Sequence, residues 1–173
     1  MKMKKLLLVG IVALSFVNTN AQTPFTTEVD KDNVTVLNGI IAKNDIATNA
    51  AFTSWYGSNQ NSYKPDTSVT NAMANTKDKV QYIVFGGTWC GDTQFILPKF
   101  FKLQEQSGLS ESHLSLYAVD RNKKTLGNIA DAFKITNVPT IIVMKDGKEV
   151  GRVVEYGKTG KWDTELGQIL SGL

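Results

Sequence analysis

The sequence predicts an α/β domain with a mixed central sheet flanked by helices and an N-terminal helical extension. Three observations predict this class. β-Favouring runs alternate with helical patterns after residue 80, the first of these runs is almost continuously apolar, and an Asp-Gly pair joins the last two. Alternating strands and helices require parallel neighbours, whereas an Asp-Gly turn adds an antiparallel strand. The 173 residues, 42% of them hydrophobic, suit one globular domain rather than a disordered or fibrous chain.

Residues 1–21 have the pattern of a secretory signal peptide. Three lysines precede an apolar stretch from Leu6 to Val17, and a small polar run ends at Ala21. The stretch is shorter than the roughly 20 apolar residues that a spanning helix needs. We therefore expect a periplasmic or secreted mature chain that starts at Gln22, with no stable membrane insertion after cleavage. The residue directly after the predicted cleavage site is not a Cys, so a lipid anchor is not expected.

Removal of this segment changes the charge balance. The chain has 19 basic and 16 acidic residues, and three of the lysines lie in residues 1–21. The mature chain is then formally neutral and lacks the basic footprint of nucleic-acid binding. It has one Cys and one His, which cannot build a zinc site by themselves. We therefore expect no nucleic-acid partner, no metal and no cofactor.

Residues 22–79 are predicted to form an extension packed on the core. Its first part, residues 22–43, is polar and Thr-rich, which favours an extended lead-in. Asn44 or Asp45 can then cap a helix whose small and aromatic stripe ends near Tyr56. The extension is therefore expected to be helical after its lead-in.

The second part of the extension starts with a segment rich in turn formers, residues 57–64, which predicts a loop. Pro65, followed by Asp, then opens a second short helix. Trp55, Tyr56 and Tyr63 either pack between the helices and the core or form an aromatic binding face. Packing is the simpler interpretation of helical spacing.

The core is predicted to span residues 80–173. The elements expected in it are a strand over 80–85, a helix over 90–106 kinked by Pro98, a strand over 114–119, a helical face over 126–133, a hairpin of 140–144 with 150–154, and a last helix capped by Thr159.

The chemistry of the sequence is concentrated at one strand–turn–helix junction. This junction places the only cysteine, Cys90, at a helix N-terminus, where the macrodipole and free N–H groups stabilise a thiolate. The Thr93 hydroxyl follows on the same face and could donate to the sulfur. Asp92 acts in the opposite direction, because a carboxylate beside a thiolate disfavours it, or it simply suits the helix end.

Several motifs, taken together, resemble the thioredoxin superfamily. They are Trp89-Cys90-Gly91, Pro98, Asn137-Val138-Pro139-Thr140, Lys145-Asp-Gly147 and Glu155-Tyr-Gly157. The resemblance implies a thioredoxin fold in which a cis peptide bond precedes Pro139 and faces Cys90. It also implies that Trp89, Gly91, Val138 and Pro139 bind an extended partner chain beside the sulfur.

Two positions depart from that family's pattern. The second cysteine of the Cys-x-x-Cys motif is replaced by Thr93, so an internal disulfide cannot form. The buried acid that thioredoxins place six residues before the first cysteine is replaced by Val84. Ordinary dithiol chemistry is therefore excluded.

A narrower resemblance extends the match upstream of the core. The segments that carry it are Phe52-Thr-Ser-Trp-Tyr56, Tyr63-Lys-Pro65, Trp89-Cys-Gly-Asp-Thr93 and Val119-Asp-Arg121. They resemble an exported, largely uncharacterised thioredoxin-like group of Bacteroidetes-type bacteria. This resemblance implies that the N-terminal helices are part of the domain.

Two functions fit these residues. In the first, the chain is a monothiol redox protein whose Cys90 exchanges with a protein or small-molecule thiol or disulfide, and an external thiol resolves the product. In the second, it is a non-catalytic module that binds an extended peptide beside an inert Cys90. The lost second thiol and buried acid favour the second function, and the retained Trp-Cys-Gly setting favours the first.

Overall fold

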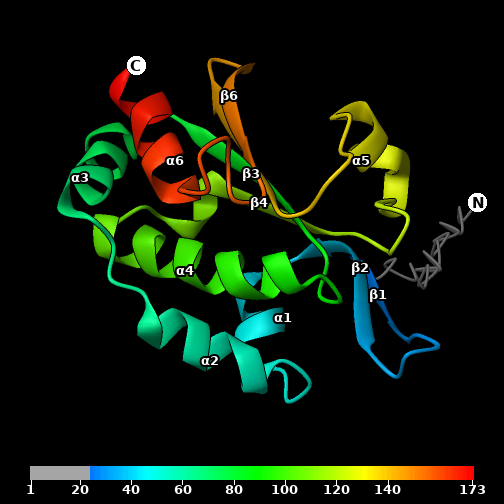
Figure 1. Cartoon of the computed structure of the whole chain (residues 1–173). Helices are drawn as coiled ribbons and strands as arrows, with labels where there is room; N and C mark the ends of the chain where they lie inside the picture. The colour runs from blue at the N-terminus through cyan, green and yellow to red at the C-terminus, as the bar shows by residue number, and fades with distance from the viewer. Residues whose placement is uncertain (1–23) are drawn as a thin grey trace, which may run out of the picture.

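The computed structural model describes residues 24–173, and in that range six strands form one mixed sheet (Figure 1). The predicted signal peptide lies outside the described residues. The strand order is β1-β2-β4-β3-β5-β6, in which β3 and β4 pair in parallel and the other neighbours are antiparallel. The strands are β1 Phe25–Val29, β2 Thr35–Ile41, β3 Gln81–Gly86, β4 Leu114–Ala118, β5 Thr140–Lys145 and β6 Lys148–Val154.

Helices cover both faces of the sheet, and their apolar residues form two clusters. The larger cluster takes residues from α1, α2, α3, α4 and α6, and the smaller one from α5 (Figure 1). The helices are α1 Lys43–Ala47, α2 Thr53–Ser62, α3 Thr67–Thr76, α4 Gly91–Ser107, α5 Ile129–Ala132 and α6 Trp162–Ser171. The central strand β3 serves both clusters, because successive side chains point to opposite faces: Val84 joins the larger and Phe85 the smaller.

The predicted lead-in over residues 22–43 is wrong in one respect, because it contains a β-hairpin. Strands β1 and β2 pair along their length, and β2 then pairs with β4. The Asp30 carboxylate shapes the turn by accepting from the N–H groups of Asp32 and Val34, both at 2.9 Å. Leu37 and other β2 residues are buried against the core, and this burial stabilises the hairpin. The polar composition of the segment gave no indication of it.

The predicted loop over residues 57–64 is also wrong, because most of it belongs to α2. The Ser58 and Ser62 hydroxyls donate to carbonyls within the helix, so these turn formers are accommodated inside it. Tyr56 is buried, with its ring 6.4 Å from that of Phe101 on α4. Packing between α2 and α4 thus stabilises a helical conformation in a segment whose local composition favours a turn.

Two helical predictions in the core need adjustment. The face expected over residues 126–133 is interrupted, since Gly127 and Asn128 have φ values of 74° and 57°. A 3₁₀ turn therefore precedes α5 instead of a continuous helix. The last helix starts after Lys161 as its N-cap rather than at Thr159.

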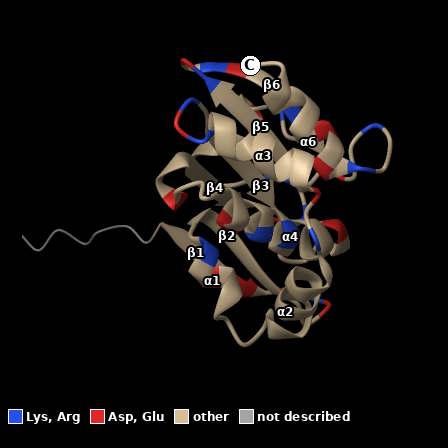
Figure 2. Cartoon of the chain, turned by 90° about the vertical axis from the view of Figure 1, so that its left-hand side faces the viewer, with Lys and Arg blue, Asp and Glu red and all other residues tan. Residues whose placement is uncertain are grey.

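Charged residues of both signs are scattered along the ribbon. On the side shown in Figure 2, blue and red segments are interspersed, with no continuous basic stripe. Within residues 24–173, no helix combines the length and apolar character that crossing a bilayer requires.

Candidate functional site

The single cysteine lies where the chain passes from β3 to α4. Cys90 is the N-cap residue of the 17-residue helix α4 and is half-buried. Its N–H donates to the Gly87 carbonyl at 2.9 Å, and its own carbonyl accepts from the Gln94 N–H at 3.0 Å. The sulfur therefore lies at the positive end of a long helix, a position that stabilises a thiolate.

The loop before β5 lies directly against this sulfur. The Cys90 thiol donates to the carbonyl of Val138 at 3.1 Å. The peptide bond between Val138 and Pro139 is cis. The Thr140 hydroxyl donates to the Asn137 carbonyl at 2.7 Å and closes the same turn. The fold thus brings together residues 48 positions apart along the sequence, as the separation of Cys90 and Val138 shows.

Gly91, the first residue of α4, faces open space. The residue is exposed, and a Cβ added to it would have no heavy atom within 4 Å apart from its chain neighbours. Packing within the described chain therefore does not require glycine here. Glycine leaves the surface next to Cys90 without a side chain.

Thr93 makes a different hydrogen bond from the predicted one. Its side chain is buried, and its hydroxyl oxygen accepts from the Gly87 N–H at 3.1 Å. In the described part of the chain no hydrogen bond joins Thr93 to the Cys90 sulfur. Gly87 follows the last residue of β3, so its N–H needs this partner outside the sheet. Thr93 stabilises the turn that carries the cysteine.

The Trp89 ring is fixed on one flank of the site. Its indole N–H donates to the Val119 carbonyl at 2.9 Å. The ring lies so close to Gly87 that an added Cβ there would be 2.7 Å from the indole Cε2. The guanidinium of Arg121 lies 5.5 Å from the ring centroid and the Lys123 ammonium 6.0 Å away, both within cation–π range.

Arg121 connects this flank to the N-terminal hairpin. Its guanidinium pairs with Asp30 at 2.6 Å and with Asp32 at 3.2 Å, both in the turn between β1 and β2. The backbone N–H of Val34, followed by the Arg121 side chain, holds the pKa of Asp30 below its ordinary value. The cation over Trp89 is therefore held in place by the hairpin.

Thr88 joins the hairpin to the cysteine loop more directly. Its side chain is 2% exposed. The hydroxyl donates to the Thr35 carbonyl at 2.9 Å and accepts from the Leu37 N–H at 3.2 Å. These contacts satisfy backbone groups of β2 in the part of the strand that precedes its pairing with β4. Thr88 was not predicted as a site residue, because only the tertiary fold brings β2 beside it.

Asn59 supports the loop from the other side. Pro98 has no N–H for the carbonyl of Gln94, four residues earlier in α4. The Asn59 amide of α2 donates to that carbonyl at 3.1 Å. The Gln94 side chain in turn donates to the Thr88 carbonyl at 2.8 Å. Two parts of the extension, β2 and α2, are thus hydrogen-bonded to the segment around Cys90.

The opposite flank of the site is aromatic and exposed. Tyr156 follows β6, and its ring lies 5.8 Å from that of Phe95 on α4, with the two side chains 36% and 41% exposed. The Glu155 N–H donates to the Pro139 carbonyl at 2.7 Å, which places this loop at the site. Burial, followed by the neighbouring Asp92 carboxylate, raises the pKa of Tyr156 above its ordinary value.

Tyr156 belongs to the Glu155-Tyr-Gly157 motif, and no role was predicted for it from the sequence. The available signal was its position two residues beyond the last strand of a sheet whose loops converge on Cys90. Asp92 was expected near the sulfur, and it lies in the first turn of α4, two residues after Cys90. The loop after β6 lies beside the start of this helix, because the Tyr156 ring is 5.8 Å from that of Phe95.

The remaining titratable candidates do not form a second centre. Val84 is buried in the larger apolar cluster, so β3 offers no acid there. His113 lies at the approach to β4 with its Nδ1 3.0 Å from the Val80 carbonyl. In residues 24–173, no three His, Cys, Asp or Glu side chains gather in a way that could hold a metal ion.

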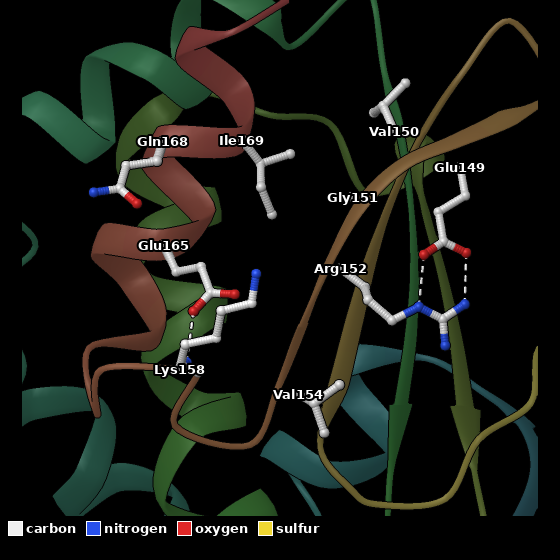
Figure 3. Close-up of a pocket in the computed structure, with 10 residues that line it drawn as sticks. Glu149, Val150, Gly151, Arg152, Val154, Lys158, Glu165, Gln168 and Ile169 are labelled. Atoms are coloured by element: carbon white, nitrogen blue, oxygen red, sulfur yellow. Dashed lines mark hydrogen bonds and ion pairs between the residues drawn. The ribbon is translucent and has the colours of Figure 1, made fainter.

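A cleft away from the cysteine lies between β6 and α6 (Figure 3). It encloses about 770 Å³ and includes none of the residues around Cys90. Arg152 and Glu149 pair across its strand side, and Glu165 on α6 accepts from the Lys158 N–H (Figure 3). A bulge interrupts the β5–β6 register beside Val150, which makes this edge a poor template for an added strand.

Comparison with known proteins places this geometry in a family. The thioredoxin family model matches residues 64–165, a range that starts before α3 and ends within the first turns of α6. Thioredoxin-1 of Saccharomyces cerevisiae is 32% identical over 92 residues, covering 53% of this chain and 82% of the yeast protein. Thioredoxin of Staphylococcus haemolyticus is 33% identical over 89 residues, covering 50% of this chain and 79% of the bacterial one.

Among solved structures, an engineered HIV epitope scaffold matches with a TM-score of 0.50 and 16% identity over 71% of this chain and 84% of that one. At this identity the match concerns the fold alone. The mixed sheet, the flanking helices and the family match agree with the predicted thioredoxin fold. This chain belongs to the thioredoxin family.

Proposed function

We propose that the chain is an exported monothiol redox protein that uses Cys90 for thiol–disulfide exchange with a protein or small-molecule partner. The observation that carries the proposal is the setting of Cys90: a half-exposed thiol at the start of α4, against the Val138 carbonyl and beside an open Gly91. A buried structural cysteine needs neither a helix N-terminus nor an open approach.

The chemistry needs one protein sulfur. The Cys90 thiolate attacks one sulfur of a partner disulfide, a Cys90–partner bond forms, and the partner's own S–S bond breaks. The second partner sulfur leaves as a thiolate and takes a proton from water. An external thiol gives its proton to water and attacks the partner sulfur as a thiolate, so that a bond between the external and partner sulfurs forms, the Cys90–partner bond breaks and Cys90 leaves as a thiolate.

The partner is proposed to lie as an extended segment over Gly91 and along Val138 and Pro139, with Trp89 as one wall. Support comes from the open space at Gly91 and from the contact between the sulfur and the Val138 carbonyl. An extended segment can satisfy backbone groups of the receiving loop by β-pairing. No metal or cofactor is part of this proposal.

Export is proposed from the sequence of residues 1–21, and the Trp89-Cys-Gly-Asp-Thr93 site supports assignment to the exported Bacteroidetes-type group described above. Expression of the full chain in a Gram-negative host tests the export proposal. We expect a periplasmic or secreted product whose first residue is Gln22. A cytoplasmic product that retains Met1 would overturn the proposal.

A second candidate function is peptide binding without chemistry. Val84 and Thr93 favour it, because they replace the acid and the second thiol of the family pattern. Both side chains are buried, and the Thr93 hydroxyl accepts a hydrogen bond from the Gly87 N–H. In that case Cys90 would be one wall of a binding groove. The two functions differ in whether a partner becomes covalently attached.

Covalent capture of a defined probe separates the two functions. We would incubate residues 22–173 with a fluorescent peptide that carries one disulfide, and measure adduct mass and non-covalent binding by anisotropy. The monothiol function predicts one adduct per chain in the wild type and none in Cys90→Ser, with the fold of the variant verified by circular dichroism. Equal non-covalent binding by both chains, without an adduct, would establish the binding module instead.

A further inference from the structure

The turn of residues 137–140 carries the carbonyl that contacts the Cys90 sulfur. The Val138 carbonyl accepts from the Cys90 thiol at 3.1 Å. Within residues 24–173, no hydrogen bond uses the Val138 N–H. Since a folded chain rarely leaves such a group without a partner, this stretch of backbone is suited to receive the main chain of another segment. Its orientation beside the sulfur therefore matters for the proposed exchange.

Glu155, from the loop after β6, bonds to this turn on both sides of Val138. Its N–H donates to the Pro139 carbonyl at 2.7 Å, and its carboxylate accepts from the Asn137 side-chain amide at 2.9 Å. The Thr140 hydroxyl donates to the Asn137 carbonyl and closes the turn without connecting it to another element. Glu155 therefore ties the residue before Val138 and the residue after it to the end of β6.

The backbone of Glu155 has an unfavourable conformation that these contacts explain. Its φ is 51°, in the left-handed region that residues with a side chain rarely adopt. Glycine would adopt this φ without a steric penalty but would offer Asn137 no carboxylate. In the described part of the chain, the Glu155 carboxylate has no ion pair, so the Asn137 amide is its partner. The bond to Asn137 thus gives glutamate an advantage over glycine here.

We propose that Glu155 and Asn137 are positioning residues that hold the Val138 backbone in the orientation in which an extended partner pairs with it beside Cys90. The inference rests on the proposed monothiol function and adds two side chains outside the cysteine loop. Both act through the turn and take no part in bond making, which stays with Cys90 and the partner disulfide.

The test compares the exchange rates of two disulfides with residues 22–173. One is the disulfide peptide described above, which has backbone N–H and carbonyl groups, and the other is bis(2-hydroxyethyl) disulfide, which has neither. Asn137→Ala and Glu155→Ala should each slow exchange with the peptide by about three- to tenfold, as expected for one lost hydrogen bond. Exchange with the small disulfide should stay unchanged. The double variant should be no slower than either single variant, because the two side chains share one bond.

Two further variants separate positioning from a general loss of structure. Glu155→Gln keeps an oxygen that can accept from the Asn137 amide, so it should exchange with the peptide at the wild-type rate. Asn122→Ala is the matched control for Asn137→Ala. Asn122 is exposed in the loop after β4, and its side-chain amide makes no hydrogen bond to the described residues, so this variant should also react as the wild type does. Circular dichroism verifies that each variant is folded.

Three results would overturn the positioning role and leave the monothiol function standing. They are unchanged peptide exchange in Asn137→Ala and Glu155→Ala, equal slowing of both disulfides, and a Glu155→Gln variant as slow as Glu155→Ala. A wild-type chain that exchanges with neither disulfide faster than its own unfolded form would overturn the monothiol function, and the positioning role with it.

Discussion

The two flanks of Cys90 are built differently. On the Trp89 flank, the ring donates to the Val119 carbonyl, and the Thr88 hydroxyl bonds to the backbone of β2. On the opposite flank, the rings of Phe95 and Tyr156 are more than one-third exposed. One flank is thus fixed to the N-terminal extension, and the other is an exposed aromatic surface.

This difference indicates that the N-terminal extension supports the loop that carries Cys90. Its hairpin and α2 contribute apolar residues to the larger core cluster, and their polar atoms bond to the cysteine loop at Thr88 and Gln94. Backbone groups that would otherwise lack partners are satisfied in this way. The extension therefore stabilises the geometry of the site as well as the fold.

The largest effect is expected from Thr88→Val, which breaks the link between β2 and the cysteine loop. The hydroxyl is buried and has two backbone partners, so its loss should lower the free energy of unfolding by about 1–3 kcal/mol. Urea unfolding followed by circular dichroism measures this change. Thr26→Val on the exposed strand β1 is the control, for which we expect less than about 0.5 kcal/mol. Equal effects of the two variants would mean that the Thr88 hydroxyl bonds to β2 do not contribute to the free energy of unfolding.

A smaller effect is expected from Asn59→Ala, which leaves the Gln94 carbonyl without the donor that Pro98 cannot supply. We expect a loss of about 1 kcal/mol in the free energy of unfolding, together with slower Cys90 alkylation. Asn61→Ala is the matched control, since it lies in the same helix and gains the same helix propensity. If Asn59→Ala were as stable as Asn61→Ala, the bond to α4 would contribute nothing.

The smallest effect is expected from Arg121→Ala, which frees the hairpin turn from the Trp89 flank. The pairs with Asp30 and Asp32 are at the surface, so the drop in the thermal unfolding midpoint should be slight and should shrink in high salt. Because the pKa of Asp30 is lowered in the folded chain, its contribution is present above its ordinary value of 3.8 and is lost as the pH falls further. The gap between wild type and variant should therefore close in acid.

Lys124→Ala is the control for Arg121→Ala, since it removes a cation of the same loop that pairs with Asp131 instead. It should leave the fluorescence of Trp89 unchanged, whereas Arg121→Ala should alter it. Identical spectra and midpoints for the two variants would mean that Arg121 has no special relation to the Trp89 flank.

Much of the core could be predicted from the sequence, because its strands are dense in β-branched and aromatic residues. The runs that begin at Val80, Leu114 and Thr140 correspond to β3, β4 and β5. The hairpin of β1 and β2 was missed, since polar side chains on its exposed strand hide the buried positions of its partner. The composition of a short segment does not show which of its residues the tertiary fold will bury.

The candidate site could be predicted only in part for the same reason. The placement of Cys90 and Asp92 at the start of α4 follows from local sequence. The bond that the Thr93 hydroxyl accepts from the Gly87 N–H was not predicted, because that N–H needs a partner only when β3 ends and the chain turns. Tyr156 lies beside α4, with its ring 5.8 Å from that of Phe95, and no local pattern indicates that contact.

The central claim is that the fold makes Cys90 a reactive single thiol. It is tested most directly by the rate at which residues 22–173 exchange with an aromatic disulfide reagent at pH 7, with the same chain unfolded in urea as reference. The account predicts exchange at least about tenfold faster in the folded chain, with one reagent thiol released per protein. A folded chain that reacts at the unfolded rate or more slowly would contradict the claim and identify Cys90 as an inert wall of a binding groove.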